Sequence, residues 1–284
     1  MKGVLLVDAG SSKTDWSFLN EETREIMRFK TTGINPALHS YEQIKDIIKN
    51  VSYNLNQPQP EEIYFFGAGC ASKELNDKIS TVLNEFWQPE KLKVQSDIMA
   101  AAIALFGDKS GIVAILGTGS NSCLYKNGEI IDQIPSLGYI LGDEGSGAAL
   151  GKRLLNYYFK RQLPEKATEL FETTYHISIP EVIKNTYRGE TPSAYLASFS
   201  PFLLENKNIP EIKHLIETEF RSFFEKNIIP YHSDLNIGFV GSIAWHYKEI
   251  IIDIAKEKGL KTDKFIKEPM PDLEQYFLTF KTNI

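Results

Sequence analysis

The chain has 284 residues, of which 42% are hydrophobic and 24% are charged, and its formal net charge is -6. These values are typical of a globular protein of one or two domains with a sizeable core. The negative charge and the lack of a basic run argue against nucleic acid or an anionic membrane as a partner. Only Cys70 and Cys123 occur, so we expect no disulfide framework and a cytoplasmic protein. No stretch is long enough for a membrane span, and Asp8 interrupts the apolar start too early for a secretory signal.

A Gly/Ser turn between two strands opens the chain. The apolar run Gly3–Val7 enters the turn Asp8–Thr14, and a second strand follows over 15–19. Further along, alternation and helical spacing predict strands over 25–30, 63–66 and 92–96 and helices over 41–53, 74–87 and 98–106.

The second half repeats this layout. A strand over 111–116 enters the turn Gly117–Ser122, and a second strand runs to Tyr125. The rest predicts mostly helix over 147–232, a strand from 237 into a tight turn, a helix over 243–258, a strand over 264–266 and a helix over 273–280. The repetition predicts two related α/β domains with a cleft between them, in which the two turns clamp one triphosphate.

Both turns present backbone N–H groups and hydroxyls without bulky side chains, which suits a phosphate chain. The first is not a P-loop, because a strand rather than a helix follows it. Asp8, at the end of a strand, either bonds its own turn or holds Mg²⁺ through water beside phosphate oxygens. Lys13 is either a surface lysine or a cation for the phosphates.

Asp97 ends one predicted strand and starts a helix. Its carboxylate is therefore expected at the carboxyl edge of a sheet, where ligands bind in α/β folds. It serves either as a plain N-cap or as a general base that takes the proton of a substrate hydroxyl.

Three further glycine clusters are candidate ligand-binding segments. Gly142–Gly147 places two carboxylates among glycines before a helix, either as a simple capping arrangement or to let the backbone approach a ligand closely. Ser136–Tyr139, which includes Gly138, is expected to form part of a sugar-pocket wall. Gly238–Ser242 is expected to leave a flat backbone surface for an adenine, or else to be a tight strand-to-helix connection. Gly67–Ser72, followed by a strand ending in Asp97, fits a dinucleotide-binding unit only weakly, because Ser72 replaces the last glycine.

In their order and spacing these segments resemble the sugar-kinase, actin and heat-shock chaperone ATPase superfamily. Within it they are most similar to the N-acetylglucosamine kinase branch of the BadF/BadG/BcrA/BcrD-type ATPase family. Asp8–Thr14 and Gly117–Asn121 match its two phosphate motifs, Gly142–Ser146 its Gly-Asp-Glu-Gly-Ser segment, and Gly238–Ser242 its adenosine motif.

The resemblance implies two ribonuclease H-like (actin-like ATPase) domains with a nucleotide cleft. They are expected at 1–109 and 110–267, with a helical insertion over about 147–232. A C-terminal helix over about 268–284 is expected to pack back on the first domain.

The resemblance also implies an ATP-dependent kinase that phosphorylates a hydroxyl of an amino sugar, N-acetylglucosamine first. Asp97 aligns with the catalytic base, and Asn35, Gly138 and Asp143 join it in the sugar site. The implied cofactors are ATP and Mg²⁺, the latter at Asp8. The other ATP-binding residues are expected to be Gly10, Ser11, Ser12, Lys13, Thr14, Gly117, Thr118, Gly119, Ser120, Gly238, Gly241 and Ser242.

A homodimer is a further implication of the family. The same family holds activators of acyl-CoA dehydratases, which bind an iron–sulfur cluster between subunits through cysteines. That activity is the first alternative, although neither Cys70 nor Cys123 matches the expected cluster positions. A dinucleotide-binding oxidoreductase built on Gly67–Ser72 is the second.

Overall fold

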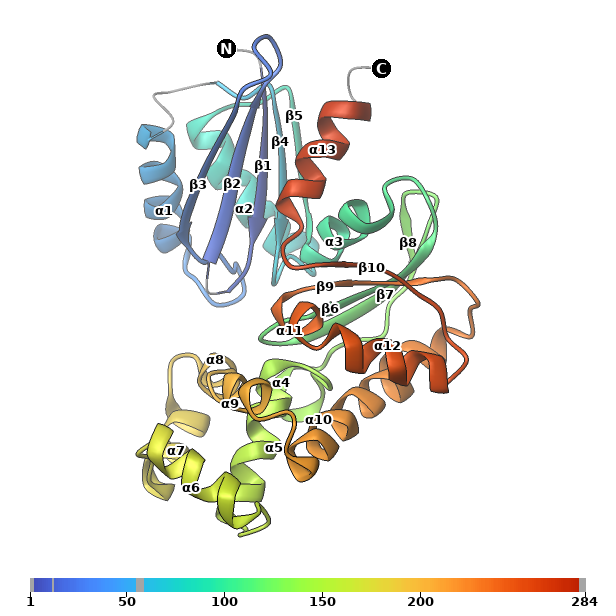
Figure 1. Ribbon diagram of the computed structural model, residues 1–284. Coiled ribbons are helices and arrows are strands. Elements are labelled where there is room, and N and C mark those ends of the chain that lie inside the picture. The colour runs from blue at the N-terminus through green and yellow to red at the C-terminus, as the bar shows by residue number, and fades with distance from the viewer. Residues whose placement is uncertain (1–2, 12, 55–58, 281–284) are drawn as a thin grey trace. The chain divides into compact units, whose positions relative to one another are not determined.

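The computed structural model describes residues 3–11, 13–54 and 59–280, which form two compact units (Figure 1). The first unit comprises Met1–Gly107 and Pro269–Ile284, and the second comprises Asp108–Glu268. Each unit is built on its own five-stranded sheet. Within the described residues, no helix is both long and apolar enough to cross a membrane.

The sheet of the first unit has the strand order β3-β2-β1-β4-β5. β1, β4 and β5 run parallel, whereas β2 and β3 are antiparallel to their neighbours. The two antiparallel strands distinguish this sheet from the parallel dinucleotide-binding fold. The strands are β1 (Gly3–Ala9), β2 (Lys13–Asn20), β3 (Ile26–Thr32), β4 (Glu62–Gly67) and β5 (Lys91–Ser96).

Helices cover both faces of this sheet. Side chains alternate along β1, so that Leu5, Val7 and Ala9 join a core with side chains of α1 and α2. The other face, on which Asp8 lies, is covered by α3 and α13. The helices are α1 (Tyr41–Asn54), α2 (Lys73–Phe86), α3 (Asp97–Phe106) and α13 (Met270–Phe280).

The C-terminal helix α13 is fastened to the first unit by a buried carboxylate. Glu274 is only 2% exposed, and its Oε1 accepts hydrogen bonds from Ser17 Oγ and Arg28 Nε, both at 2.6 Å. The second guanidinium nitrogen of Arg28 reaches the other carboxylate oxygen. On the same helix, Phe277 packs on Tyr64 of β4 with ring centroids 4.5 Å apart. The C-terminal helix α13 thus packs on the sheet whose strand β1 lies at the start of the chain.

The second unit repeats the same sheet order as β8-β7-β6-β9-β10. β6, β9 and β10 are parallel, and β7 and β8 are antiparallel to their neighbours. β6 therefore corresponds to β1, β7 to β2, and β9 to β4. The strands are β6 (Gly111–Leu116), β7 (Ser120–Lys126), β8 (Glu129–Asp132), β9 (Ile237–Val240) and β10 (Thr262–Ile266).

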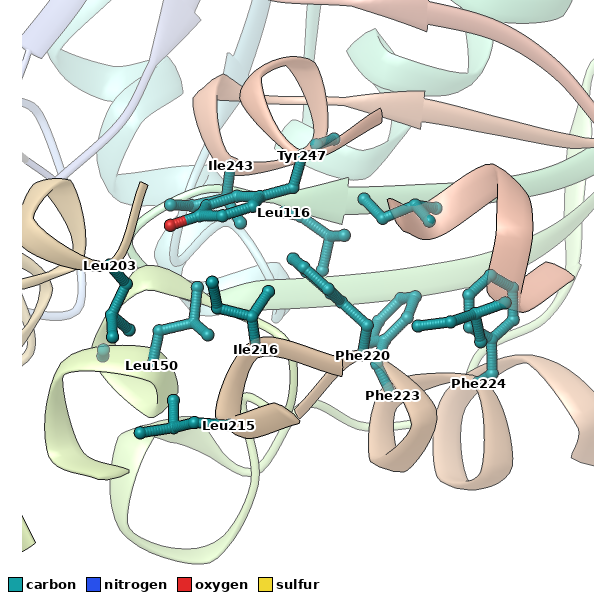
Figure 2. Packing of buried hydrophobic residues seen from close by; sticks show 14 of the residues in the cluster. Leu116, Leu150, Leu203, Leu215, Ile216, Phe220, Phe223, Phe224, Ile243 and Tyr247 are labelled. Atoms are coloured by element: carbon teal, nitrogen blue, oxygen red, sulfur yellow. The ribbon is translucent and has the colours of Figure 1, made fainter. Parts of the chain in front are cut away.

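A helical segment between β8 and β9 supplies most of the core of the second unit. Figure 2 shows that Leu116 of β6 lies beside Phe220 of α10, Leu150 of α5 beside Ile216, and Ile243 of α11 beside Tyr247, all within one buried cluster. The helices are α4 (Gly138–Leu141), α5 (Gly147–Phe159), α6 (Glu165–Thr174), α7 (Ile179–Arg188), α8 (Pro192–Ala197), α9 (Ser200–Glu205), α10 (Pro210–Phe223), the π-helical turn η1 (Phe224–Ile228), the 3₁₀ turn η2 (Ile229–Tyr231), α11 (Ser242–His246) and α12 (Lys248–Glu257).

Two sequence predictions differ from the structure in this unit. The helix predicted over 243–258 is two helices, because Tyr247 leaves helical geometry with φ -106° and ψ 15°. Its buried ring packs on Phe220, with centroids 5.4 Å apart, which favours the break. The short elements β8 and α4 were not predicted, since four residues give too little periodicity.

Candidate functional site

In the first unit, the carboxyl ends of three parallel strands meet along one edge of the sheet. Ala9 of β1 is opposite Gly67 of β4, which is opposite Ser96 of β5. The residues that follow are the first phosphate turn, the segment Gly67–Ser72, and Asp97. The strand register therefore brings three of the segments singled out in the sequence to the same edge.

The first phosphate turn is a tight hairpin connection. Gly10 N donates to Lys13 O at 2.9 Å, and Ser11 between them is exposed. Lys13 Nζ lies 3.2 Å from an oxygen of Asp15, so its charge is shared with that carboxylate. Thr14 is buried opposite Ala9, which places it on the face turned away from Asp8. Ser12 lies outside the described residues.

Asp8 and Asp15 are paired directly across β1 and β2, so the two carboxylates share a face of the sheet. Lys30 Nζ lies 2.9 Å from Asp15 Oδ1 and offsets the negative charge of that carboxylate. No group of three or more His, Cys, Asp or Glu side chains able to hold a metal occurs in the described parts of the chain. This donor set fits Mg²⁺ held by one carboxylate, water and phosphate oxygens rather than by a protein cage.

Asn35 links the first phosphate turn to the loop before α1. Its Nδ2 donates to Ser11 Oγ at 2.9 Å, and its Oδ1 accepts from Ala37 N at 3.0 Å. Gly69, at φ +85°, leaves room for the amide, because a Cβ there would stand 2.1 Å from Asn35 Oδ1. Gly33 is constrained in the same way by the backbone of Ser11.

This contact explains the segment Gly67–Ser72 without a dinucleotide. Its glycine allows the approach of Asn35, and Ser72 is the N-cap of α2, with Leu75 N donating to Ser72 Oγ at 3.4 Å. Sequence reasoning missed this role because the partner, Asn35, is distant in the chain.

Asp97 is the first residue of α3 and is partly buried. The N-cap position belongs to Ser96, so the interpretation of Asp97 as a plain N-cap is wrong. Burial raises the pKa of the Asp97 carboxyl, opposed by the backbone N–H groups of Ile98 and of Asp97 itself. Such a carboxylate is a better proton acceptor than an exposed one.

The second phosphate turn, Gly117–Ser120, is held mainly by the backbone of α5. Gly147 N donates to Gly117 O at 2.8 Å and Ala148 N donates to Thr118 O at 3.0 Å, while Gly117 N donates to Gly119 O at 2.9 Å. A Cβ on Gly117 would meet no atom within 4 Å. The carbonyls of the turn are thus used within the protein, and one side of Gly117 is open.

Asp143 reaches this turn from the glycine segment that precedes α5. It is 7% exposed, has φ 56°, and its Oδ1 accepts from Ser120 N at 3.1 Å. Burial raises the pKa of the Asp143 carboxyl, and the Ser120 N–H opposes that shift. Gly138, also expected in the sugar site, is the first residue of the short helix α4. A Cβ on Gly138 would meet no atom within 4 Å.

The adenosine motif packs against the same turn. Gly241 has φ +118°, and a Cβ there would lie 2.2 Å from Leu116 O, so the glycine is required by the protein's own backbone. This packing explains the glycine from within the protein, and a surface for adenine at this turn stays a prediction. Gly238 lies inside β9 opposite Val113, rather than in the turn, and Ser242 is the first residue of α11.

Sequence reasoning missed the partners of Glu144. Its two carboxylate oxygens accept from Lys226 Nζ at 2.9 Å and Asn227 Nδ2 at 3.2 Å. Both partners lie in η1, and Asn227 O accepts from Ser122 Oγ of β7 at 2.8 Å. A π-helical turn has no clear sequence signal, although such turns are frequent at functional sites.

Comparison with known proteins places this geometry in a family. No protein-family model matches the chain, and no curated protein matches its sequence. A solved structure from Porphyromonas gingivalis, provisionally named an N-acetylglucosamine kinase, is 36% identical, with a TM-score of 0.92 over 98% of this chain and 99% of that one.

Two further structures share the fold at lower identity. A protein from Chromobacterium violaceum with the same provisional name is 15% identical, with a TM-score of 0.76 over 97% of this chain and 99% of its own. A hexokinase of the ROK family from Thermus thermophilus is 13% identical, with a TM-score of 0.55 over 93% and 92%.

The two related mixed sheets and these similarities define the two-domain ribonuclease H-like fold of actin-like ATPases. The chain belongs to the N-acetylglucosamine kinase-like family of that superfamily.

Proposed function

We propose that the protein is an ATP-dependent sugar kinase that transfers the γ-phosphoryl group to a hydroxyl of an amino sugar, most readily N-acetylglucosamine. The observation that carries the proposal is the full-length similarity, at 36% identity, to the P. gingivalis protein. Asp97 at the carboxyl edge of the first sheet supports it independently.

In this proposal Asp97 accepts the proton of the sugar hydroxyl as that oxygen bonds to the γ-phosphorus and the bond to the β-phosphate oxygen breaks. The phosphate turns would hold the phosphate oxygens through backbone N–H groups and hydroxyls. Asp8 would hold Mg²⁺, which supplies neutralisation of the phosphate charge when it is bound with ATP.

Asn35 and Asp143 are proposed to select the sugar. An amide and a carboxylate can donate to and accept from sugar hydroxyls. A site built to pair with hydroxyls discriminates strongly against analogues that lack them, because its own buried polar groups are then left unpaired. Glucosamine is proposed as the second substrate.

The cysteines weigh against the activator alternative. Cys70 and Cys123 are both buried, and their pKa values are raised to about 12, in each case chiefly by burial. A cluster needs thiolate ligands, which such groups do not provide readily at neutral pH.

The test is coupled ADP release with Mg²⁺-ATP and N-acetylglucosamine, glucosamine, N-acetylmuramate or glucose, compared by kcat/KM. We expect the highest value for N-acetylglucosamine. Steady ADP release that no sugar stimulates would contradict the proposal and would favour a nucleotide-dependent switch.

A further inference from the structure

The two residues expected to bind the sugar occupy corresponding places in the two units. Asn35 lies between β3 and α1, and Asp143 lies between β8 and α5, in sheets of identical strand order. Each hydrogen-bonds a serine of the phosphate turn in its own unit. Asn35 Nδ2 donates to Ser11 Oγ at 2.9 Å, and Ser120 N donates to Asp143 Oδ1 at 3.1 Å.

Both contacts are built into the fold. Asn35 and Asp143 are 8% and 7% exposed, so each polar group depends on its protein partners. A glycine stands against each of them. A Cβ would lie 2.1 Å from Asn35 Oδ1 at Gly69 and 3.0 Å from Asp143 Oδ2 at Gly119.

Neither contact uses the full bonding capacity of its side chain. An amide nitrogen has a second N–H, and a carboxylate has several lone pairs, so each residue can bind a sugar hydroxyl and keep its serine.

From these observations we propose that Asn35 and Asp143 are also positioning residues for the two phosphate turns, and that sugar binding thereby tightens nucleotide binding. The coupling, though not the positioning, rests on the proposed function. A sugar that fixes Asn35 also fixes Ser11, so that less ordering remains when the nucleotide binds. Reciprocally, nucleotide binding raises the affinity for the sugar by the same factor.

The positioning role is tested without any sugar. The Kd of a non-hydrolysable ATP analogue is measured by calorimetry for the wild type, Asn35→Ala, Ser11→Ala and the double variant. Because one hydrogen bond is lost, we expect the Kd of the analogue to rise about fivefold in Asn35→Ala. The double variant is expected to bind no more weakly than Ser11→Ala, because the two residues act through one contact.

Asn20→Ala is the matched control. Asn20 is 4% exposed in the same unit, and its Oδ1 accepts from Glu22 N and Thr23 N at the other end of β2. An unchanged Kd in Asn35→Ala, an equal rise in Asn20→Ala, or additive effects of Asn35→Ala and Ser11→Ala would each overturn the proposal for the first unit.

For the second unit the matched pair is Asp143→Asn and Asp143→Gly. Both replacements suit φ 56°, but only asparagine keeps an acceptor for Ser120 N. We expect a Kd close to that of the wild type in Asp143→Asn and about fivefold higher in Asp143→Gly. Equal Kd values in the two variants would overturn the role of Asp143.

The coupling is tested by adding saturating N-acetylglucosamine. We expect the Kd of the analogue to fall at least about fivefold in the wild type and to change much less in Ser11→Ala. A bound sugar that leaves the wild-type Kd unchanged would overturn the coupling. If no sugar is bound or phosphorylated, the proposed function and the coupling fail together, while the sugar-free measurements still decide the positioning role.

Discussion

The two phosphate turns have the same strand–turn–strand frame but are fixed by different means. In the first unit, a side-chain contact from Asn35 to Ser11 joins the turn to the next loop. In the second unit, Asp143 accepts from Ser120 N, but main-chain bonds from Gly147 and Ala148 at the start of α5 also hold the turn, and Gly241 packs on the backbone of Leu116.

This difference shows that one strand–turn–strand frame can be stabilised by a side-chain contact with or without additional backbone packing. The first turn is expected to respond to loss of a polar group. The second is expected to respond also to added volume at Gly241, because a Cβ there would lie 2.2 Å from Leu116 O.

The largest expected effect belongs to the first unit, where Asp97 has no proposed acid–base counterpart in the second. Asp97→Asn should lower kcat by roughly 10²–10⁴-fold, with little change in nucleotide Kd, because only the proton acceptor is lost. Steady-state kinetics with N-acetylglucosamine and calorimetry with the ATP analogue measure the two quantities. Near-normal turnover would exclude the role.

The raised pKa of Asp97 also predicts an effect on stability. A carboxyl with a raised folded-state pKa favours the fold below its ordinary pKa, and this contribution is lost as pH rises through the raised value. Asp97→Asn should therefore unfold at higher denaturant concentration than the wild type at neutral pH, with a smaller difference at acid pH. An Asp97→Asn variant that is less stable than the wild type at neutral pH would contradict this prediction.

The same raised pKa predicts that wild-type kcat/KM falls as the pH drops below it.

Gly241→Ala should produce the largest loss of stability. The added Cβ meets Leu116 O at 2.2 Å and the φ of +118° is unfavourable, so we expect about 3 kcal/mol or more from overpacking and backbone strain. Gly117→Ala is the control, since its Cβ meets nothing within 4 Å and should affect nucleotide binding rather than folding. Equal urea midpoints for the two variants would show that the packing argument is wrong.

Much of each frame could be predicted from local sequence. The strand–turn–strand units were predicted because apolar runs and Gly/Ser turns lie next to one another in the chain. The packing that requires a glycine at position 241 could not be predicted, because its neighbour Leu116 lies on a strand far away in sequence. The contact of Asn35 with Ser11 escaped for the same reason, although both residues were singled out.

Arg28→Ala should have an intermediate effect on the first unit. It leaves buried Glu274 with Ser17 but without the guanidinium. Because Arg28 is 59% exposed and water can replace part of the contact, we expect a loss of about 2 kcal/mol rather than the full cost of breaking a buried pair. Faster protease cleavage within α13 would accompany it. Unchanged stability would mean that the contact with Arg28 does not help to hold α13.

The smallest effects compare two helix N-caps, one in each unit. Ser146 Oγ accepts from Ala149 N at 3.1 Å and is buried, whereas Ser72 Oγ accepts from Leu75 N at 3.4 Å and is exposed. Ser146→Ala should cost about 1 kcal/mol and Ser72→Ala less, as measured by chemical denaturation. The reverse order would contradict the distinction.

The most direct test of the proposed kinase activity follows the terminal phosphoryl group itself. ATP labelled with heavy oxygen in its γ-phosphoryl group is incubated with N-acetylglucosamine and either the wild type or Asp97→Asn, and the sugar is examined by mass spectrometry. The account predicts labelled sugar phosphate from the wild type and little from the variant. Labelled inorganic phosphate without any sugar phosphate, from the wild type, would contradict it.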